Sequence, residues 1–195
     1  VLQVDEQKTY FLSDLTATPQ QYELLLTMLQ QLAQHTPLQY VLGYETFMNL
    51  RFAVTPDVLI PRPETAQLVR QIIEENKHRS SLRILDVGTG SGCIAISLAH
   101  YLPGAQVTAV DVSREALAIA QKNAHSIGVN VQFKHLDFLK DAASLLPEFD
   151  ILVSNPPYVL ESEKIDIEKH VLQHEPHLAL FVPNQTPLLF YQAIA

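Results

Sequence analysis

The sequence predicts an α/β protein with a doubly wound parallel sheet, and three patterns lead to this prediction. Short apolar runs typical of buried strands alternate with longer segments whose apolar residues follow helical spacing. A glycine-rich turn over 88–92 joins the first of these strands to its helix. Polar residues, Asp111 and Asn155 among them, stand where later strands end. Because parallel strands need crossover connections, helices should cover both faces of the sheet.

The alternation of strands and helices runs from residue 82 to the end of the chain. Gly128 closes one of the helices as a C-terminal cap. A sheet of four strands would leave an uncovered edge, so we expect further strands beyond Ala195. The expected strands are 83–87, 106–110, 131–135 and 149–154, and the expected helices are 93–101, 113–126 and 188–195.

The first part of the chain predicts a small helical domain, residues 1–36, which we expect to be incomplete at its start. Thr18 and Pro19 suit a helix start, with Pro at the first helical position. The stripe that follows needs a packing partner, because one amphipathic helix cannot bury its own apolar face. That stripe consists of Tyr22, Leu25, Leu26, Leu29, Leu32 and Ala33.

Residues 37–62 lose the helical period and predict a β-hairpin linker. Leu50, Phe52 and Val54 alternate with other residues, and the apolar run 40–42 precedes Gly43, so these two runs are expected to pair. A helix over 64–76 then opens a second domain, residues 63–195. Its expected apolar face is Leu68, Val69, Ile72 and Ile73.

Composition narrows the class of protein. Apolar residues make up 47% and charged residues 17% of the chain, which is typical of a globular protein. The net charge of -8, without a cluster of Lys and Arg, disfavours nucleic acid as a partner. No apolar run is long enough to span a membrane, and no signal peptide is present. A single cysteine, Cys93, excludes an internal disulfide, and we expect a cytoplasmic protein.

The glycine turn favours S-adenosylmethionine as the cofactor. Asp86 precedes a G-x-G-x-G pattern that differs from the dinucleotide fingerprint, because Cys93 follows its last glycine. A carboxylate there would repel a pyrophosphate but not an ammonium or a sulfonium group. The turn sits at the carboxyl end of a strand, where ligands bind in such sheets. The expected cofactor-binding residues of this segment are Asp86, Gly88, Thr89, Gly90, Ser91 and Gly92.

Two further strand ends complete the expected cofactor site. Asp111 ends the second strand beside the glycine turn, where its carboxylate can accept hydrogens from two ribose hydroxyls. Asp137 and Phe138 follow the third strand. Phe138 can flank the adenine ring or simply pack in the core, and Asp137 can meet the exocyclic amine.

The tetrapeptide Asn155-Pro156-Pro157-Tyr158 follows the fourth strand and is expected to hold the substrate. Its two prolines stiffen the backbone and remove two donors, which leaves carbonyl acceptors and the Asn155 side-chain oxygen. Asn155 and the Pro156 carbonyl can accept the two hydrogens of an amide or amine, and Tyr158 can stack on the planar group. Such a nitrogen needs orientation more than a strong base, so we expect methyl transfer to nitrogen.

At this point the sequence resembles the bacterial release factor glutamine methyltransferases, the PrmC/HemK family of class I methyltransferases with a Rossmann-like sheet. The resemblance rests on the segments 86–92 and 155–158, and on the upstream segments 37–43, Phe47 and 59–65. It implies methylation of the glutamine side-chain nitrogen, N5, in the Gly-Gly-Gln motif of peptide chain release factors 1 and 2. S-adenosylhomocysteine would be the product, and the helical domain would recognise the release factor.

Some readings stay open at the level of sequence. An adenine-N6 nucleic-acid methyltransferase would share every site residue, and an inactive S-adenosylmethionine-binding module is the alternative outside enzymes. Arg62 and Glu64 can either hold substrate backbone or fix the linker. His170, His174 and His177 lie close together, but the HExxH order is absent and Pro176 interrupts them. We expect solvated histidines and no metal.

Overall fold

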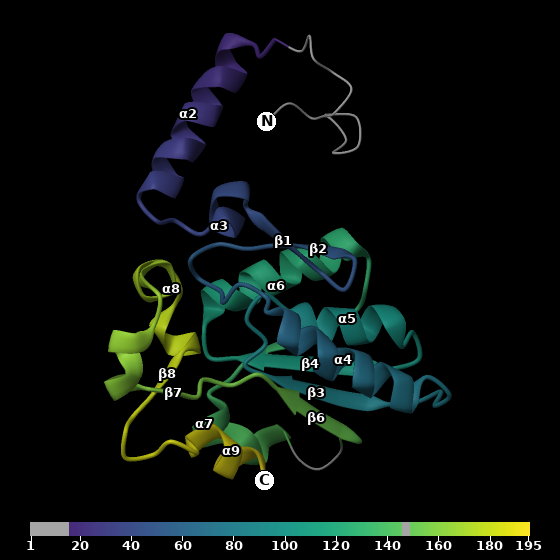
Figure 1. Cartoon of the computed structure of the whole chain (residues 1–195). Helices are drawn as coiled ribbons and strands as arrows, with labels where there is room; N and C mark the ends of the chain where they lie inside the picture. The colour runs from purple at the N-terminus through teal and green to yellow at the C-terminus, as the bar shows by residue number, and fades with distance from the viewer. Residues whose placement is uncertain (1–15, 146–148) are drawn as a thin grey trace.

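The computed structural model of the chain describes residues 16–145 and 149–195. Its centre is a parallel sheet in which the strands lie in the order β5-β4-β3-β6 (Figure 1). The strand order reverses between β3 and β6, which makes their carboxyl ends the switch point where such sheets bind ligands. The strands are β3 (Arg83–Val87), β4 (Gln106–Asp111), β5 (Gln132–His135) and β6 (Ile151–Ser154).

Helices cover both faces of this sheet, as the sequence predicted (Figure 1). One face carries three helices and the other carries two shorter ones. Every helix expected in this part of the chain is present, with ends that differ by one or two residues, and α7 adds a short crossover between β5 and β6. The helices are α4 (Pro63–Asn76), α5 (Cys93–Tyr101) and α6 (Arg114–Ile127) on one face, and α7 (Phe138–Asp141) and α9 (Leu189–Ile194) on the other.

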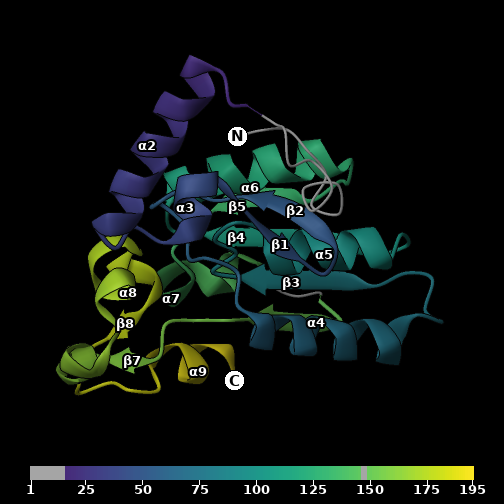
Figure 2. The same ribbon diagram turned by 45° about the horizontal axis from the view of Figure 1, so that its top comes forward.

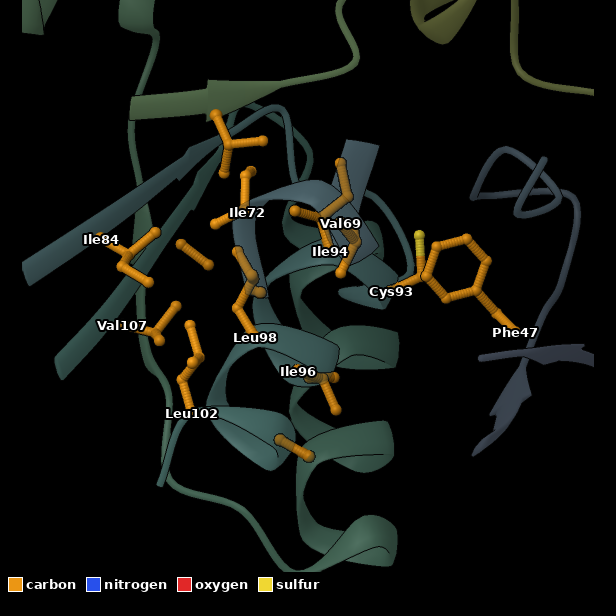
Figure 3. Packing of buried hydrophobic residues seen from close by; sticks show 14 of the residues in the cluster. Phe47, Val69, Ile72, Ile84, Cys93, Ile94, Ile96, Leu98, Leu102 and Val107 are labelled. Atoms are coloured by element: carbon orange, nitrogen blue, oxygen red, sulfur yellow. The ribbon is translucent and has the colours of Figure 1, made fainter. Parts of the chain in front are cut away.

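The alternation of side chains along β3 builds the two cores. Ile84 packs with Val107 against α4 and α5, whereas Leu85 and Val87 pack with Phe138 on the other face. Figure 3 shows the larger core, in which Val69 and Ile72 of α4 meet Ile94 and Leu98 of α5. Val69 and Ile72 of the expected stripe of α4 are buried, while Leu68 is exposed.

The helix α2 (Pro19–Ala33) begins where the sequence predicted. Thr18 is its N-cap: its hydroxyl accepts from the Gln21 N–H while the Gln21 side chain accepts from the Thr18 N–H, a reciprocal capping box. Residues 1–15 of the predicted helical segment lie outside the described residues. No residue of α2 is buried by other described residues. The described residues therefore do not include the expected packing partner of its apolar stripe.

The linker contains the predicted hairpin, but its first half differs from the prediction. Residues 40–42 belong to a short helix, α3 (Leu38–Leu42), and not to a strand. Pro37 is the N-cap of α3, and Gly43 ends the helix in the left-handed conformation with φ of 77°. The Tyr40 ring packs near Val58 and its hydroxyl donates to the Val58 carbonyl at 2.7 Å, a contact that ties this short helix to the segment after β2.

The hairpin itself pairs β1 (Tyr44–Phe47) with β2 (Leu50–Ala53) through a two-residue turn. Met48 and Asn49 both have positive φ, the conformation that suits the twist of a tight hairpin. Phe47 fixes the hairpin to the core beside Cys93, as Figure 3 shows. The buried Asn123 of α6 adds hydrogen bonds to both the N–H and the carbonyl of Ala53. The hairpin is therefore attached firmly to α6 and to the core of the main sheet.

The last part of the described chain forms a small group of elements at the carboxyl end of the sheet (Figure 2). Within residues 16–145 and 149–195 the main sheet has no fifth strand, and residues 159–160 and 181–182 pair as a separate two-stranded parallel sheet. The helices of the described chain include none long and apolar enough to cross a membrane. The elements of the group are β7 (Val159–Leu160), α8 (Lys169–His174), β8 (Phe181–Val182) and two 3-10 turns, Glu161–Asp166 and His177–Ala179.

Candidate active site

A cavity of about 450 Å³ opens at the carboxyl ends of β3, β4 and β6. Its lining comes from the glycine turn, the ends of these strands, the linker segment 56–62 and the group of elements around α8. The cavity contains most of the residues that the sequence singled out. Gly88, Thr89, Gly90, Ser91, Arg62, Asp111, Asp137, Phe138, Asn155 and Pro157 line it.

The glycine turn presents bare backbone to this cavity. The N–H groups of Gly88 and Thr89 both donate to the Val110 carbonyl, at 2.9 and 3.0 Å, which fastens the turn to the end of β4. Gly88 and Gly90 have φ values of 70° and 55°, and a Cβ atom on either would meet open space. These two glycines therefore set the turn's conformation and leave room for a ligand to approach the main chain.

Gly92 has a packing role and does not line the cavity. Its φ is 83°, and an added Cβ would lie 2.6 Å from Ile96 Cδ1 and 3.1 Å from Ala120 Cβ. The absence of a side chain lets α5 start against α6. In the same place, Asn123 Nδ2 donates to the Ser91 carbonyl at 2.9 Å, which ties the turn to α6. Gly92 thus helps to fix the glycine turn by allowing close packing against α6.

Asp86 lies beneath the turn and not in the cavity. Its side chain is fully buried, and Oδ2 accepts from the Thr89 hydroxyl at 2.6 Å and from the Ala95 N–H at 3.2 Å. Burial raises the pKa of this carboxyl to about 7, against the lowering effect of those two hydrogen bonds. Oδ1 is buried and has no partner among the described residues. The carboxylate fixes the turn and faces the start of α5.

Asp111 stands at the end of β4 with its carboxylate held by two backbone donors. Oδ2 accepts from the Gly90 N–H at 2.8 Å, and Oδ1 accepts from the Ser113 N–H at 2.9 Å. Each carboxylate oxygen keeps a further lone pair for a ligand hydroxyl. Because one of these donors belongs to the glycine turn, Asp111 and the turn form one rigid unit.

Two predicted site residues follow β5, the charged Asp137 and the apolar Phe138. Phe138 is 8% exposed and packs with Leu85 and Val87 while one side of it lines the cavity, so it belongs to both the core and the site. Asp137 caps α7 by accepting from the Leu139 N–H at 3.2 Å, and it pairs with Lys140 at 2.6 Å. That ion pair holds the pKa of the Asp137 carboxyl below its usual value.

Asn155 follows β6 and faces the first turn of α4. Its Nδ2 donates to Thr65 Oγ1 at 3.3 Å, and the preceding Ser154 hydroxyl donates to the Val87 carbonyl at 2.7 Å. Pro157 lines the cavity next to Asn155. Pro156 is buried and Tyr158 is 59% exposed, and neither is among the lining residues. The tetrapeptide therefore presents Asn155 and Pro157 inward and its tyrosine at the surface.

Arg62 makes an ion pair that the sequence did not reveal. Its Nη2 lies 2.6 Å from Oε1 of Glu175, whose side chain is fully buried, and Glu175 Oε2 accepts from the Ile60 N–H at 3.1 Å. In the sequence, Glu175 is notable only because it lies close to His170, His174 and His177. Nothing in its local pattern indicated a partner 113 residues away, and the same holds for Thr65 beside Asn155.

The three histidines point to different partners. His170 lies 3.3 Å from Glu168, His174 contacts the Gln34 carbonyl at 3.3 Å, and His177 contacts the Leu172 carbonyl at 2.8 Å. In residues 16–145 and 149–195, the structure brings together no group of three or more side chains suited to a metal ion. Cys93 is buried, and burial raises the pKa of its thiol to about 12, so it packs as an apolar residue.

The geometry of the cavity fits S-adenosylmethionine. Bare backbone at Gly88 and Gly90, the fixed carboxylate of Asp111 and the ring of Phe138 share one cavity. An acceptor pair suits ribose hydroxyls, a ring suits adenine, and open main chain suits the amino acid end of the cofactor. The fold and the site define a class I S-adenosylmethionine-dependent methyltransferase. In agreement, residues 64–178 match the methyltransferase small domain.

The particular family follows from the rest of the chain. Residues 1–43 match the PrmC N-terminal domain. A release factor glutamine methyltransferase of Bacteroides thetaiotaomicron is 47% identical over 195 residues, which is all of this chain and 69% of that protein. The protein of the same name from Flavobacterium psychrophilum is 55% identical over 171 residues, 86% of this chain and 60% of that protein. The chain belongs to the release factor glutamine methyltransferase family.

The chain spans between 60% and 69% of the length of these two relatives. Among solved structures, TrmN from Thermus thermophilus aligns with 65% of this chain and 40% of its own, with 27% identity and a TM-score of 0.44. A methyltransferase from Agrobacterium tumefaciens aligns with 58% of this chain and 39% of its own, with 20% identity and a TM-score of 0.49. The family assignment rests on the sequence relatives.

Proposed function

We propose that this chain methylates the side-chain amide nitrogen, N5, of the glutamine in the Gly-Gly-Gln motif of peptide chain release factors 1 and 2. One observation carries the proposal: Asn155, whose side chain can accept from an amide N–H, lines the same cavity as the glycine turn and Asp111. An amide donor and a cofactor can therefore meet there. Because release factors act in translation, we expect the reaction to take place in the cytoplasm.

The cofactor half of the cavity would hold S-adenosylmethionine, which supplies an electrophilic methyl group on a positively charged sulfur. Asp111 would accept the two ribose hydroxyls with the lone pairs left by Gly90 and Ser113. Phe138 would lie against the adenine ring, and Asp137 stands nearby for its exocyclic amine. Asp86 would act indirectly, by holding Thr89 and the turn in place. Thr89, Ser91 and Gly92 complete that turn.

The substrate half of the site would bind the glutamine amide through its hydrogens. Asn155 Oδ1 would accept one hydrogen and the Pro156 carbonyl the other, while Pro157 limits the space beside the amide. Tyr158 is exposed outside the cavity lining, and it would lie over the planar amide as the loop enters. Arg62 lines the same cavity with one side and pairs with Glu175, so it can hold substrate backbone only from that fixed position.

This arrangement addresses the weak nucleophilicity of an amide nitrogen. Its lone pair is delocalised into the carbonyl, and two acceptors that draw the hydrogens out of the amide plane favour a tetrahedral nitrogen. The nitrogen would then take the methyl group that S-adenosylmethionine supplies, S-adenosylhomocysteine would leave, and the methylated nitrogen would release one proton to solvent. Orientation of this kind is worth about 7–11 kcal/mol in well-placed reactions. No strong base is needed before attack.

We also propose that the chain is divided by task. Residues 1–36 would belong to a helical part that recognises the release factor, 37–62 to the hairpin linker, and 63–195 to the methyl-transfer domain. The buried hydrogen bonds from Asn123 to Ala53 support a stiff connection between the last two parts. A stiff linker would hold a bound release factor at a fixed distance from the cavity.

Mass spectrometry of a release factor after incubation with the protein and labelled S-adenosylmethionine tests the proposal. We expect one added methyl group, on the glutamine of the Gly-Gly-Gln motif. A release factor with that glutamine replaced by glutamate is the matched control and should remain unlabelled. A parallel arm contains unmethylated DNA. Label on DNA alone would replace the glutamine reaction with adenine methylation, and no label in any arm would contradict the proposal.

A further inference from the structure

The hydroxyl of Thr65 is the partner of Asn155 in the substrate half of the site. Thr65 lies in the first turn of α4, comes from a segment 90 residues away in sequence, and its Oγ1 accepts from Asn155 Nδ2 at 3.3 Å. Thr65 is 8% exposed, so little water reaches this contact. No other hydrogen bond to the Asn155 side chain is formed within residues 16–145 and 149–195.

This contact bears on what the Asn155 amide can offer to a substrate. The amide has one oxygen that accepts and one nitrogen that donates, and a half-turn about its last bond exchanges them. With Nδ2 bound to Thr65, Oδ1 is left as the free acceptor. The exchanged orientation would present an N–H group to the substrate amine, where two donors would face each other. A hydroxyl can donate as well as accept, so Thr65 can pair with either end of the amide; a substrate that brings N–H groups selects the orientation with Oδ1 toward it, and Thr65 then gives Nδ2 its acceptor.

The position of Thr65 is itself well fixed. Its own N–H donates to the Arg62 carbonyl at 3.1 Å, and the next residue, Ala66, is buried against the core. On the opposite side of Asn155, the Ser154 hydroxyl holds the end of β6 to the Val87 carbonyl. The backbone at Asn155 is thus fixed from β3, and its side chain from α4. The Ser154 contact restricts the position of the Asn155 backbone, and the Thr65 contact restricts rotation of the Asn155 side chain.

We infer that Thr65 is a positioning residue for methyl transfer, and that it acts by holding the Asn155 amide with its oxygen toward the substrate nitrogen. The inference rests on the proposed function. Thr65 does not accept a proton or contact the reacting atoms in this role. Its contribution should therefore appear in the rate of methyl transfer and not in cofactor affinity.

Thr65→Val removes the hydroxyl with little change of shape, and Thr65→Ser keeps it. With a release factor as substrate, we expect the valine variant to lower kcat by about tenfold, as loss of one buried hydrogen bond does. The serine variant should stay within about twofold of the unchanged protein. The dissociation constant of S-adenosylmethionine, measured by calorimetry, should be the same in all three. Thr65→Ala is a second hydroxyl-free variant in case valine disturbs folding.

A double-mutant cycle separates positioning from simple packing. In the absence of the Asn155 amide, Thr65 has nothing to position, so Thr65→Val should cost no further rate in an Asn155→Ala background under single-turnover conditions. Full activity of Thr65→Val, or rate losses that multiply in the double variant, would overturn the inference. Equal losses in the serine and valine variants with lowered melting temperatures would do the same. Methylation of the release factor by the unchanged protein tests the proposed function separately.

Discussion

Arg62 donates from Nη2 to Oε1 of Glu175 at 2.6 Å, although 113 residues separate the two in sequence. Arg62 belongs to the linker and Glu175 to the segment after α8, so the pair joins two walls of the cavity. The Glu175 carboxylate also accepts from the Ile60 N–H. One buried side chain therefore fixes the linker at two points next to the site.

Glu175→Gln should lower the free energy of unfolding, because it leaves the Arg62 guanidinium without its counter-charge. Loss of one partner of a buried pair costs about 3–5 kcal/mol, and the 33% exposure of the Arg62 side chain reduces this to about 1–3 kcal/mol. Urea denaturation measures the change. Glu168→Gln, on an exposed side chain, is the matched control and should change stability little. Equal stability of both variants would contradict the structural role of the pair.

Asn155→Ala should separate cofactor binding from methyl transfer. The substitution removes an acceptor for the substrate amide, so the rate of transfer should fall by at least about a hundredfold. Calorimetry should still detect binding of S-adenosylmethionine, because the glycine turn and Asp111 are unchanged. The exposed Asn130, replaced by alanine, provides the control. Unchanged activity of Asn155→Ala would exclude Asn155 from the role given to it.

Asp111→Asn should weaken cofactor binding. The carboxylate already accepts from two backbone N–H groups and still offers lone pairs to two hydroxyls, whereas an amide has a single accepting oxygen. Loss of hydrogen bonds to a charged acceptor should raise the dissociation constant by about ten- to a hundredfold. Calorimetry gives this constant directly. Asp166→Asn, at an exposed position, should leave it unchanged, and an unaltered constant for Asp111→Asn would contradict the ribose contact.

Gly92→Ala and Gly128→Ala compare two glycines with similar backbone conformation and different surroundings. Their φ values are 83° and 79°, but a Cβ at Gly92 would lie 2.6 Å from Ile96 Cδ1, whereas a Cβ at Gly128 would meet nothing within 4 Å. Both variants pay about 1–2 kcal/mol for the left-handed conformation, and Gly92→Ala should lose about 1–3 kcal/mol more through overpacking. Thermal or urea unfolding measures both. Equal losses would show that Ile96 and Ala120 make room for the added methyl group at little cost.

Asp86→Asn should change how stability depends on pH. The folded-state pKa of Asp86 is raised from 3.8 to about 7, so the folded protein binds this proton more tightly than the unfolded chain does. Ionisation of the buried carboxyl therefore reduces stability as pH rises from about 4 to about 7.

The asparagine variant lacks this titration. Its stability relative to the unchanged protein should rise by about 2–3 kcal/mol between pH 5 and pH 8, measured by urea denaturation without cofactor. Asp150→Asn is the control, because a bond from the Arg83 N–H and nearby arginines lower the pKa of Asp150 and place its titration below this range. A constant difference between Asp86→Asn and the unchanged protein would contradict the raised pKa.

Most of the sheet and its helices could be predicted from sequence, because their signals are local. A buried parallel strand reads as a short apolar run, and Gly128 or Ser113 mark helix ends by their own conformation or side chain. The prediction of a strand at 40–42 was wrong because the signal that decides its conformation is not local. Its three apolar residues fit a strand or a helix equally well, and the contact between Tyr40 and Val58 that favours the helix is not local.

The sequence by itself determined the fold class, and it singled out the glycine turn and the tetrapeptide 155–158 as candidates for binding cofactor and substrate, since each depends on residues close together in the chain. Only the tertiary structure decided which side chains complete the site. It moved Asp86 beneath the turn, left Tyr158 at the surface, and brought Thr65 to Asn155 and Glu175 to Arg62. The reason is physical. Burial and contacts between distant segments depend on how the helices pack on the sheet, and the spacing of residues within one segment carries no information about that packing.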